Sequence, residues 1–353
     1  MKKYKVAVLA NLKVNAPKFG GMAEDQWDDL DSEKTVDSLI NAIRSGGHHC
    51  EFLEGDITLY DTIRKYSPDI CFNICEGHFG DAREAQVPAL LEMLRIPYTG
   101  SKVLTLALAL DKSMTKRVLT YHDLPTPGFQ TIERVDEPLS SDMVFPLFVK
   151  PSQEGTGMGV SRESIVNNDS ELREQVNHIL ARYKQPALVE RYIDGREVTV
   201  GVVGNLEGVV ARRLPEDESA PRVQAGLRFF PPMEVNLKPF EQSDVVYSNR
   251  LKVELADQLD YLCPAPLDDE MVDELNWLTA AVFRVTGALD VSRVDFRLDA
   301  HDNWKPYILE INPLPGLAPG YSDLVIEAAA EGVNHTFLVN MILNTALKRN
   351  GMI

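Results

Sequence analysis

The sequence predicts an α/β protein of two or three domains that begins with a parallel sheet. Strand-like and helix-like patterns alternate over the first hundred residues, an order typical of a parallel sheet covered by helices on both faces. Near Phe145 the pattern changes to short strands around a Gly-rich stretch. A chain of 353 residues is also too long for one small domain.

The alternation begins with an apolar run at 4–10, which predicts a buried strand. Residues 33–44 carry apolar side chains at helical spacing, and Gly46 and Gly47 end that helix. The next expected elements are a strand at 50–53, a helix at 58–66 and a strand at 69–74. Parallel sheets bind ligands beyond the carboxyl ends of their strands, which here are the segments 11–31 and 76–83. The first segment is acidic and Gly-rich, as a substrate loop or a plain solvated loop would be.

The remainder of the chain predicts mixed helices and strands. Expected helices lie at 103–110, 113–121, 170–183, 271–286, 322–331 and 334–348. Expected strands begin near 145 and lie at 187–191, 197–203, 292–298 and 307–311. The stretch 212–239 has no clear periodicity.

Charge and composition exclude several classes of protein. The formal net charge of -17 argues against a general binder of nucleic acid or anionic membrane, although one cationic pocket for a phosphate ligand remains compatible with it. No apolar run approaches the roughly 18 residues of a membrane span, and the N-terminal apolar run is shorter than that of a signal peptide. We therefore expect a soluble, cytoplasmic protein whose four cysteines are reduced.

The first chemical motif lies at 145–160, where a β-rich run ends at Lys150 and a Gly-rich segment follows. Gly155, Gly157 and Gly159 allow the backbone to approach an anion closely, and a lysine ammonium adds charge suited to phosphate. The segment lacks the Gly-Lys-Ser/Thr sequence of the Walker loop. By itself it fits either a phosphate-binding hairpin or a flexible turn.

The second motif lies at 188–200, where apolar residues surround two acidic ones. Glu190 is expected at the end of a buried strand and Glu197 at the start of the next. Carboxylates in these places can accept hydrogen bonds from an amino group or from ribose hydroxyls. Ordinary polarity at a strand edge is an equal alternative for Glu197.

The third motif consists of two polar pairs within apolar strands. Arg293 and Asp295 share one strand face because side chains alternate with period two, and Glu310 and Asn312 do so on the next strand. Buried polar groups are costly unless they are paired or bound to a cation, and hard oxygen donors match Mg²⁺. The alternative is an internal salt bridge from Arg293 to one of the acids.

Together, the three motifs resemble in order and spacing the ATP-grasp superfamily, specifically its D-alanine–D-alanine ligase branch. Further matching stretches lie at 92–101, 110–112 and 262–266. The resemblance covers nearly the whole chain. It implies an N-terminal α/β domain, a central ATP-grasp subdomain with the Gly-rich loop, and a C-terminal subdomain with the metal site, at 1–102, 103–205 and 206–353. ATP would lie between the last two.

The resemblance also assigns roles to individual positions. Matches to ATP-binding positions are Lys112, Lys150, Gly155, Thr156, Gly157, Gly159, Glu190, Ile193, Glu197 and Lys252. The lysines and the loop would hold phosphates, Glu190 and the backbone near Ile193 would bind adenine, and Glu197 would bind ribose. Matches to metal positions are Asp295, Glu310 and Asn312, for two Mg²⁺ or Mn²⁺ ions. Arg293 and Lys252 would be catalytic, stabilising charge on the transferred phosphoryl group.

The implied activity is an ATP-dependent ligase that joins a carboxylate and an amine through an acyl phosphate, with amino-acid-like substrates. A homodimer formed through the first domain is a further implication. Candidate substrate-binding residues are Glu33, Glu76, Gly316 and Tyr321. Ligation of an amino acid to a carrier-protein thiol or a natural-product amine, an ATP-grasp kinase, and nucleotide binding without catalysis are alternatives.

Departures from the family pattern concentrate on the substrate side. Glu76 occupies the position of a family histidine, and Pro319 stands where a serine is expected. The loop lysine is followed by Val253 instead of an aromatic residue. We therefore expect ATP chemistry of the family type with substrates that need not be D-alanine.

Overall fold

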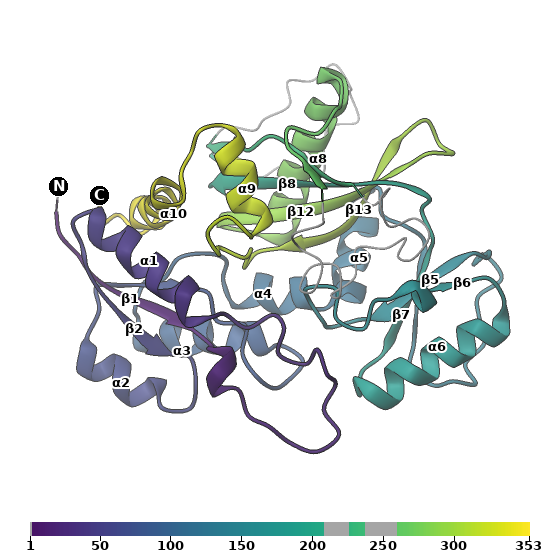
Figure 1. Ribbon diagram of the computed structural model, residues 1–353, viewed down its shortest axis with the longest axis horizontal. Coiled ribbons are helices and arrows are strands. Elements are labelled where there is room, and N and C mark those ends of the chain that lie inside the picture. Colours follow the sequence, from purple (N-terminus) through teal and green to yellow (C-terminus); the bar gives the residue numbers. More distant parts are fainter. Residues whose placement is uncertain (1, 208–225, 237–259) are drawn as a thin grey trace.

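The computed structural model describes residues 2–207, 226–236 and 260–353. Within these residues the chain forms one parallel sheet and two antiparallel sheets with helices packed on them (Figure 1). This mixture agrees with the fold class predicted from the sequence.

The N-terminal sheet has the parallel strand order β2-β1-β3. Its elements are β1 (Lys5–Ala10), α1 (Glu33–Ser45), β2 (His49–Glu54), α2 (Leu59–Tyr66), β3 (Ile70–Asn73) and α3 (Gln86–Leu94). Residues Val6–Ala10 are all buried because helices cover both faces of the central strand. The side chain of Ser32 accepts a hydrogen bond from the Thr35 amide and so caps α1. The loops that leave β1 and β3 lie at one edge of the sheet.

The second sheet has the antiparallel order β4-β7-β5-β6. Its elements and the helices before it are α4 (Val103–Leu110), α5 (Lys112–Tyr121), β4 (Phe129–Ile132), β5 (Leu147–Pro151), β6 (Ile165–Val166), α6 (Asp169–Arg182) and β7 (Ala187–Arg191). Helix α6 buries Leu172, Val176 and Ile179 against this sheet. The other face of this sheet points toward the third part of the chain.

The third sheet has the order β11-β10-β8-β12-β13, with β9 paired to β8. Its elements are β8 (Gly195–Gly204), β9 (Leu227–Phe229), β10 (Met233–Asn236), β11 (Asp260–Leu262), α8 (Asp269–Thr286), β12 (Asp290–Asp299), β13 (Lys305–Asn312), α9 (Asp323–Ala330) and α10 (His335–Arg349). Val198, Val200 and Val202 of β8 share a core with α8. The opposite face packs on α9 and α10, where Val203 joins Leu324 and Leu338.

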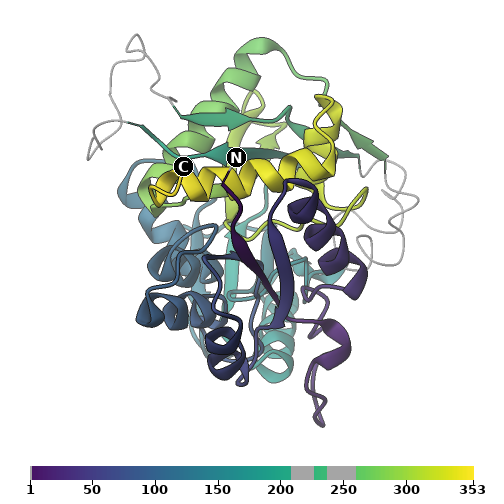
Figure 2. The same ribbon diagram turned by 90° about the vertical axis from the view of Figure 1, so that its left-hand side faces the viewer.

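Helix α10 connects the C-terminal part to the N-terminal sheet. One hydrophobic core runs from β1 through α1 to α10, and the Asn340 amide donates to the Ala42 carbonyl at 2.8 Å. The two ends of the chain lie close together beside this helix (Figure 2), and the Tyr4 hydroxyl donates to the Met352 carbonyl. The loops of the first sheet are thereby held next to β12 and β13.

Most predicted elements are confirmed within one or two residues, including α1, α4, β7 and α8. Helix α3 and strand β4 were not predicted, and the strand after the Gly-rich loop is only two residues long. Strand β8 belongs to a different sheet from the one expected. The domain limits above placed it in the central subdomain, but it pairs with β12 of the third sheet along its whole length. We therefore propose that the C-terminal unit begins with β8.

Two expectations from composition also have structural counterparts. All four cysteines are free. No described helix combines the length and apolarity needed to cross a bilayer.

Candidate active site

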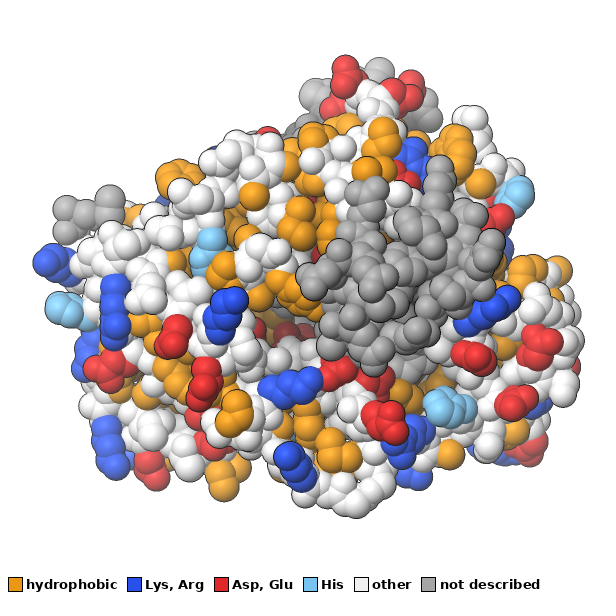
Figure 3. All heavy atoms as spheres, in the orientation of Figure 1, with side chains coloured by type: hydrophobic (Ala, Val, Ile, Leu, Met, Phe, Trp, Pro, Cys, Tyr) orange, Lys and Arg blue, Asp and Glu red, His pale blue; other side chains and the backbone are white. Residues whose placement is uncertain are grey.

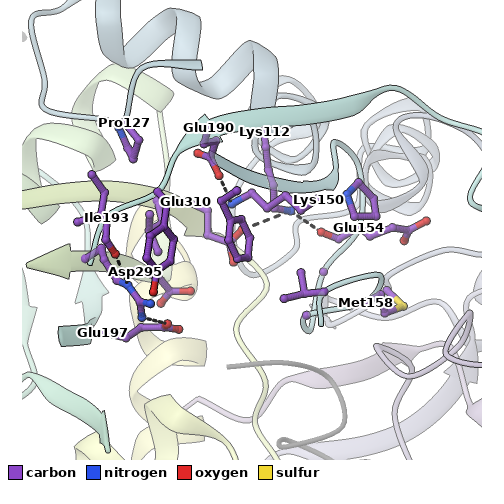
Figure 4. Close-up of a pocket in the computed structure, with 18 of the residues that line it drawn as sticks. Lys112, Pro127, Lys150, Glu154, Met158, Glu190, Ile193, Glu197, Asp295 and Glu310 are labelled. Atoms are coloured by element: carbon purple, nitrogen blue, oxygen red, sulfur yellow. Dashed lines mark hydrogen bonds and ion pairs between the residues drawn. The ribbon is translucent and has the colours of Figure 1, made fainter. Parts of the chain in front are cut away.

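Residues from distant parts of the sequence meet in a pocket between the second and third sheets, here called the lysine pocket (Figure 4). The predicted residues that line it are Lys112, Lys150, Gly155, Gly157, Glu190, Ile193, Glu197, Asp295 and Glu310. Strands β5 and β7 supply one wall, and β12 and β13 supply the opposite one. The alternation of strand side chains aims Lys150 and Glu190 inward from the second sheet, and Asp295 and Glu310 from the third.

A carboxylate held by two lysines lies at the inner end of this pocket. Glu190 is 2% exposed, and its carboxylate pairs with Lys150 at 2.7 Å and with Lys116, which is fully buried. Burial alone would raise the pKa of Glu190, but the charges of Lys116 and Lys150 outweigh it and lower that pKa to about 2. Glu190 is therefore ionised and committed to the lysines, and it fixes the position of the Lys150 ammonium.

Lys112 links the Gly-rich segment to the third sheet. Its ammonium donates to the carbonyl oxygen of Glu154 and lies 3.3 Å from a Glu310 carboxylate oxygen. Glu310 stands opposite Asp295 in the register of β12 and β13, so both carboxylates face the same space. Lysine ammonium groups and carboxylates thus alternate around the pocket, where they can bind phosphate and cations together.

Arg293 forms the ion pairs that the sequence suggested as an alternative to metal binding. Its guanidinium donates to both oxygens of Asp295, at 2.8 and 2.9 Å, and lies 3.0 Å from Asp323. The Asn312 amide also donates to Asp295 at 2.9 Å. Burial would lower the pKa of Arg293, but Asp295 and Asp323 hold it well above its usual value. Arg293 is therefore a fixed cation beside the oxygen donors.

Apolar side chains and a second arginine form the outer end of the lysine pocket. The rings of Phe148 and Tyr192 stack with centroids 6.4 Å apart, and both line the pocket. The buried Arg297 donates to the Ile193 carbonyl at 3.1 Å and to Glu197 at 2.8 Å. This end can accept a flat, partly apolar group with polar atoms along one edge.

The Gly-rich segment 155–159 borders the pocket in a conformation that favours glycine. Gly157 has a φ of +70°, a region that residues with a Cβ rarely adopt. Gly159 also has a positive φ, but it lines neither pocket, and its amide donates to Asp25 of the first-domain loop at 2.9 Å. Its predicted phosphate contact therefore lacks support in this conformation, in contrast to those of Gly155 and Gly157.

A second pocket, here called the acidic pocket, adjoins the first and shares Lys112, Glu154, Gly155 and Glu310 with it. The predicted residues Thr156, Arg293, Asn312, Glu76, Gly316 and Tyr321 line it. Its acidic lining residues are Asp28, Asp29, Asp31, Glu76, Glu84, Glu154, Glu310 and Asp323, against Lys34, Lys112 and Arg293 as basic ones. Figure 3 shows a hollow near the middle of this face with acidic side chains inside it.

Glu33 and Lys252 are the two predicted site residues not yet accounted for. Glu33 is exposed on the first turn of α1 and does not line either pocket, because the loop before it turns Asp29 and Asp31 inward instead. The structure thus argues against Glu33 as a substrate ligand. Lys252 lies outside the described residues, so its catalytic role stays a prediction.

Sequence reasoning missed Lys116, Arg297 and Arg83. Arg297 continues the period-two series of Arg293 and Asp295, a signal that would have placed it on the same strand face. Arg83 donates to the Gln153 carbonyl and pairs with Asp29 and Glu154, so it joins the first-domain loop to the Gly-rich segment. No local pattern marked Lys116 or Arg83.

This arrangement of two antiparallel sheets around a pocket of lysines and carboxylates, with a parallel-sheet domain beside it, defines an ATP-grasp enzyme. The family model described as the D-ala D-ala ligase C-terminus matches residues 118–218 and 232–344. A D-alanine–D-alanine ligase of Methylibium petroleiphilum is 35% identical over 80% of this chain and 81% of its own. Uncharacterized protein y4sG of Sinorhizobium fredii is 33% identical over 90% of this chain and 88% of its own.

Similarity in fold extends over the whole chain. The crystal structure of D-alanine–D-alanine ligase from Bacillus anthracis complexed with ATP has a TM-score of 0.71 and 19% identity, and the match covers 99% of each chain. The chain belongs to the D-alanine–D-alanine ligase family. It is an ATP-dependent ligase that forms C–N bonds.

The buried lysine–carboxylate cluster gives a prediction about stability. Glu190→Ala leaves Lys116 and Lys150 without their shared partner, and removing one member of a buried ion pair costs about 3–5 kcal/mol. We expect a clear fall in the urea midpoint of unfolding and a raised KM for ATP. Glu174→Ala, on the exposed face of α6, is the control. An unchanged midpoint for Glu190→Ala would show that the cluster does not stabilise the fold.

Proposed function

We propose that the protein uses ATP to join the carboxylate of one amino acid to the amino group of a second substrate. The observation that carries this proposal is the junction of the two pockets, where Lys112 and Glu310 belong to both. A γ-phosphoryl group at the inner end of the lysine pocket would meet a carboxylate that enters through the acidic pocket.

ATP is proposed to lie along the lysine pocket. The stacked Phe148 and Tyr192 would contact adenine at the outer end, and Glu197, held by Arg297, would accept hydrogen bonds from ribose. Lys150 and Lys112 would contact the phosphates at the inner end. Because the Glu190 carboxylate is engaged by lysines, we assign it the positioning of Lys150, with adenine recognition coming from the backbone near Ile193.

The donor set beside the phosphate positions fits Mg²⁺. Asp295 and Glu310 face each other across two neighbouring strands, and Asn312 adds an amide oxygen, all of them hard ligands. Lys112 and Arg293 neutralise these carboxylates in the structure, which is consistent with a position for cations. We propose that Asp295, Glu310 and Asn312 would hold the metal, which when bound would neutralise charge on the phosphates.

The reaction is proposed to proceed in two steps. The carboxylate oxygen of the donor attacks the γ-phosphorus of ATP, which gives an acyl phosphate and ADP. The amine of the acceptor then attacks the acyl carbon, forms the amide bond, and releases phosphate and a proton. Arg293 would stabilise the negative charge on the transferred group, and the Gly-rich segment would exclude water from it.

The direct test is ATP-dependent phosphate release by the purified protein with D- and L-amino acids, singly and in pairs. We expect release that depends on both a donor and an amine acceptor, with an amide product of matching mass. Phosphate release that needs no acceptor, or a phosphorylated substrate as the final product, would contradict ligation. A cytoplasmic location and a homodimer stay predictions from the sequence.

A further inference from the structure

The acidic pocket contains more negative charge than its own cations neutralise. Arg83 pairs with Asp29 and Glu154, Lys112 pairs with Glu310, and Arg293 pairs with Asp323. The side chains of Asp31, Glu76 and Glu84 form no ion pair or hydrogen bond with the described residues, although all three line the pocket. Three carboxylates therefore face the pocket without a partner in the described part of the chain.

Asp29 provides an independent indication of a ligand site. Its side chain is 6% exposed and lines the pocket, and one carboxylate oxygen is bound by Arg83. The other oxygen, Oδ1, is buried without any hydrogen-bond donor among the described residues. An unpaired buried acceptor is unfavourable, and a hydrogen-bond donor on a bound ligand would satisfy this oxygen.

The electrostatic environment of these groups favours binding of a cation. Burial raises the pKa of Asp31 and that of Glu84 to about 7, and Asp29 adds to both shifts. Burial also raises the pKa of Glu76 well above its usual value, and the charge of Glu84 increases this shift. A positive ligand group would relieve the repulsion among these carboxylates.

An organic ammonium is a cation that fits these carboxylates. Within the described ranges, no group of three or more His, Cys, Asp or Glu side chains is arranged to hold a metal ion. An ammonium has three donors that point in different directions, which suits carboxylates contributed by separate loops. The carboxylates here come from the loop after β1 and the loop after β3.

One α-ammonium group would neutralise only part of this charge. A bound cation would lower these raised pKa values, and the three carboxylates, once ionised, would carry more negative charge than the single ammonium of an amino acid such as alanine can neutralise. We propose, on the basis of the ligase function above, that one amino substrate carries a second ammonium in its side chain, bound by Glu76 with Asp31 and Glu84. The substrate carboxylate would then lie at the junction with the lysine pocket, near Lys112 and Arg293.

The first test is a calorimetric titration of the full chain with lysine, ornithine, norleucine and alanine, each in D and L form. The titrations contain Mg²⁺ and a non-hydrolysable ATP analogue. Norleucine matches lysine in length but lacks the side-chain ammonium. We expect lysine or ornithine to bind at least tenfold more tightly than norleucine of the same configuration. Equal or weaker binding of both basic amino acids would overturn the inference.

Variants locate the effect in the acidic pocket. Glu76→Gln keeps the side-chain size and removes its charge, and we expect the ratio of lysine to norleucine affinity to fall at least fivefold. Asp31→Asn is the second variant, in case the first does not fold. Glu174→Gln on the exposed face of α6 should leave the ratio unchanged. An unchanged ratio in both pocket variants would also overturn the inference.

A turnover assay separates this inference from the function on which it rests. Phosphate release is measured with each basic amino acid and with norleucine, as donor and as acceptor, and product masses identify the order. A higher kcat/KM for the basic amino acid in either position supports the inference. Turnover of neutral pairs alone would support the ligase function and overturn the inference. No turnover with any pair would contradict the function, and the titrations would still decide the binding preference.

Discussion

Glu310→Gln is expected to reduce kcat by at least about a thousandfold while the protein remains folded. Glu310 faces Asp295 across β12 and β13, pairs with Lys112 and borders both pockets. The amide keeps the shape of the side chain but removes the charge that would bind metal next to the phosphates. Such charge stabilisation contributes several kcal/mol, and each 1.36 kcal/mol corresponds to tenfold in rate.

The control for this substitution is Glu174→Gln, which removes an exposed carboxylate on α6. Both variants are compared with the unsubstituted protein in ATP-dependent phosphate release and in circular dichroism. Because Glu310 is partly exposed to the pocket, the fold should survive its neutralisation. Activity of Glu310→Gln within tenfold of the unsubstituted protein would refute the role of this carboxylate.

Arg293→Lys is expected to lower kcat by about a hundredfold to a thousandfold, with a smaller change in the KM for ATP. The guanidinium contacts both Asp295 oxygens and Asp323 with a planar set of donors that an ammonium cannot reproduce. Removing one donor aimed at developing charge typically costs a factor of this size. A positive charge remains, so the buried acids keep a partner.

Arg284→Lys on α8 is the matched control, because Arg284 lies away from both pockets. Single-turnover measurements of ADP formation at saturating ATP isolate the phosphoryl-transfer step. If Arg293→Lys slowed ADP formation less than threefold, Arg293 would serve only to hold Asp295 and Asp323 in place.

The periodicity of apolar residues predicted the elements that bury one clear face or run of residues in the core. The apolar run of β1 and the helical spacing of α1 are each explained by burial on the predicted faces. Helix α3 was not predicted for two reasons. Pro88 suggests a break in a helix, although proline is tolerated in the first turn, where it lies. The apolar residues of α3 also do not gather strongly on one face. Short strands such as β4 and β6 give too few residues for a period of two to be visible.

The candidate site was predictable where one strand carries several functional residues. The shared faces of Arg293 with Asp295 and of Glu310 with Asn312 follow from alternation along a strand. Their mutual placement depends on the register between β12 and β13, which the sequence does not specify. Lys116 and Glu190 lie 74 positions apart, so their ion pair depends on packing between α5 and β7.

The substrate side was least predictable because it is built from loops. The segment 11–31 was expected to meet a ligand, and Asp28, Asp29 and Asp31 do line the acidic pocket. The predicted substrate residue Glu33, just after this segment, instead lies in the exposed first turn of α1. Which loop residues turn inward depends on contacts such as the ion pair of Arg83 with Asp29, and no local pattern encodes such contacts.

A crystal structure with a non-hydrolysable ATP analogue and Mn²⁺ would examine the assignment of the lysine pocket most directly. We expect the adenine near Phe148 and Tyr192, the phosphates beside Lys112 and Lys150, and anomalous scattering peaks next to Asp295, Glu310 and Asn312. A nucleotide bound elsewhere, or Mn²⁺ peaks remote from these three side chains, would contradict the assignment.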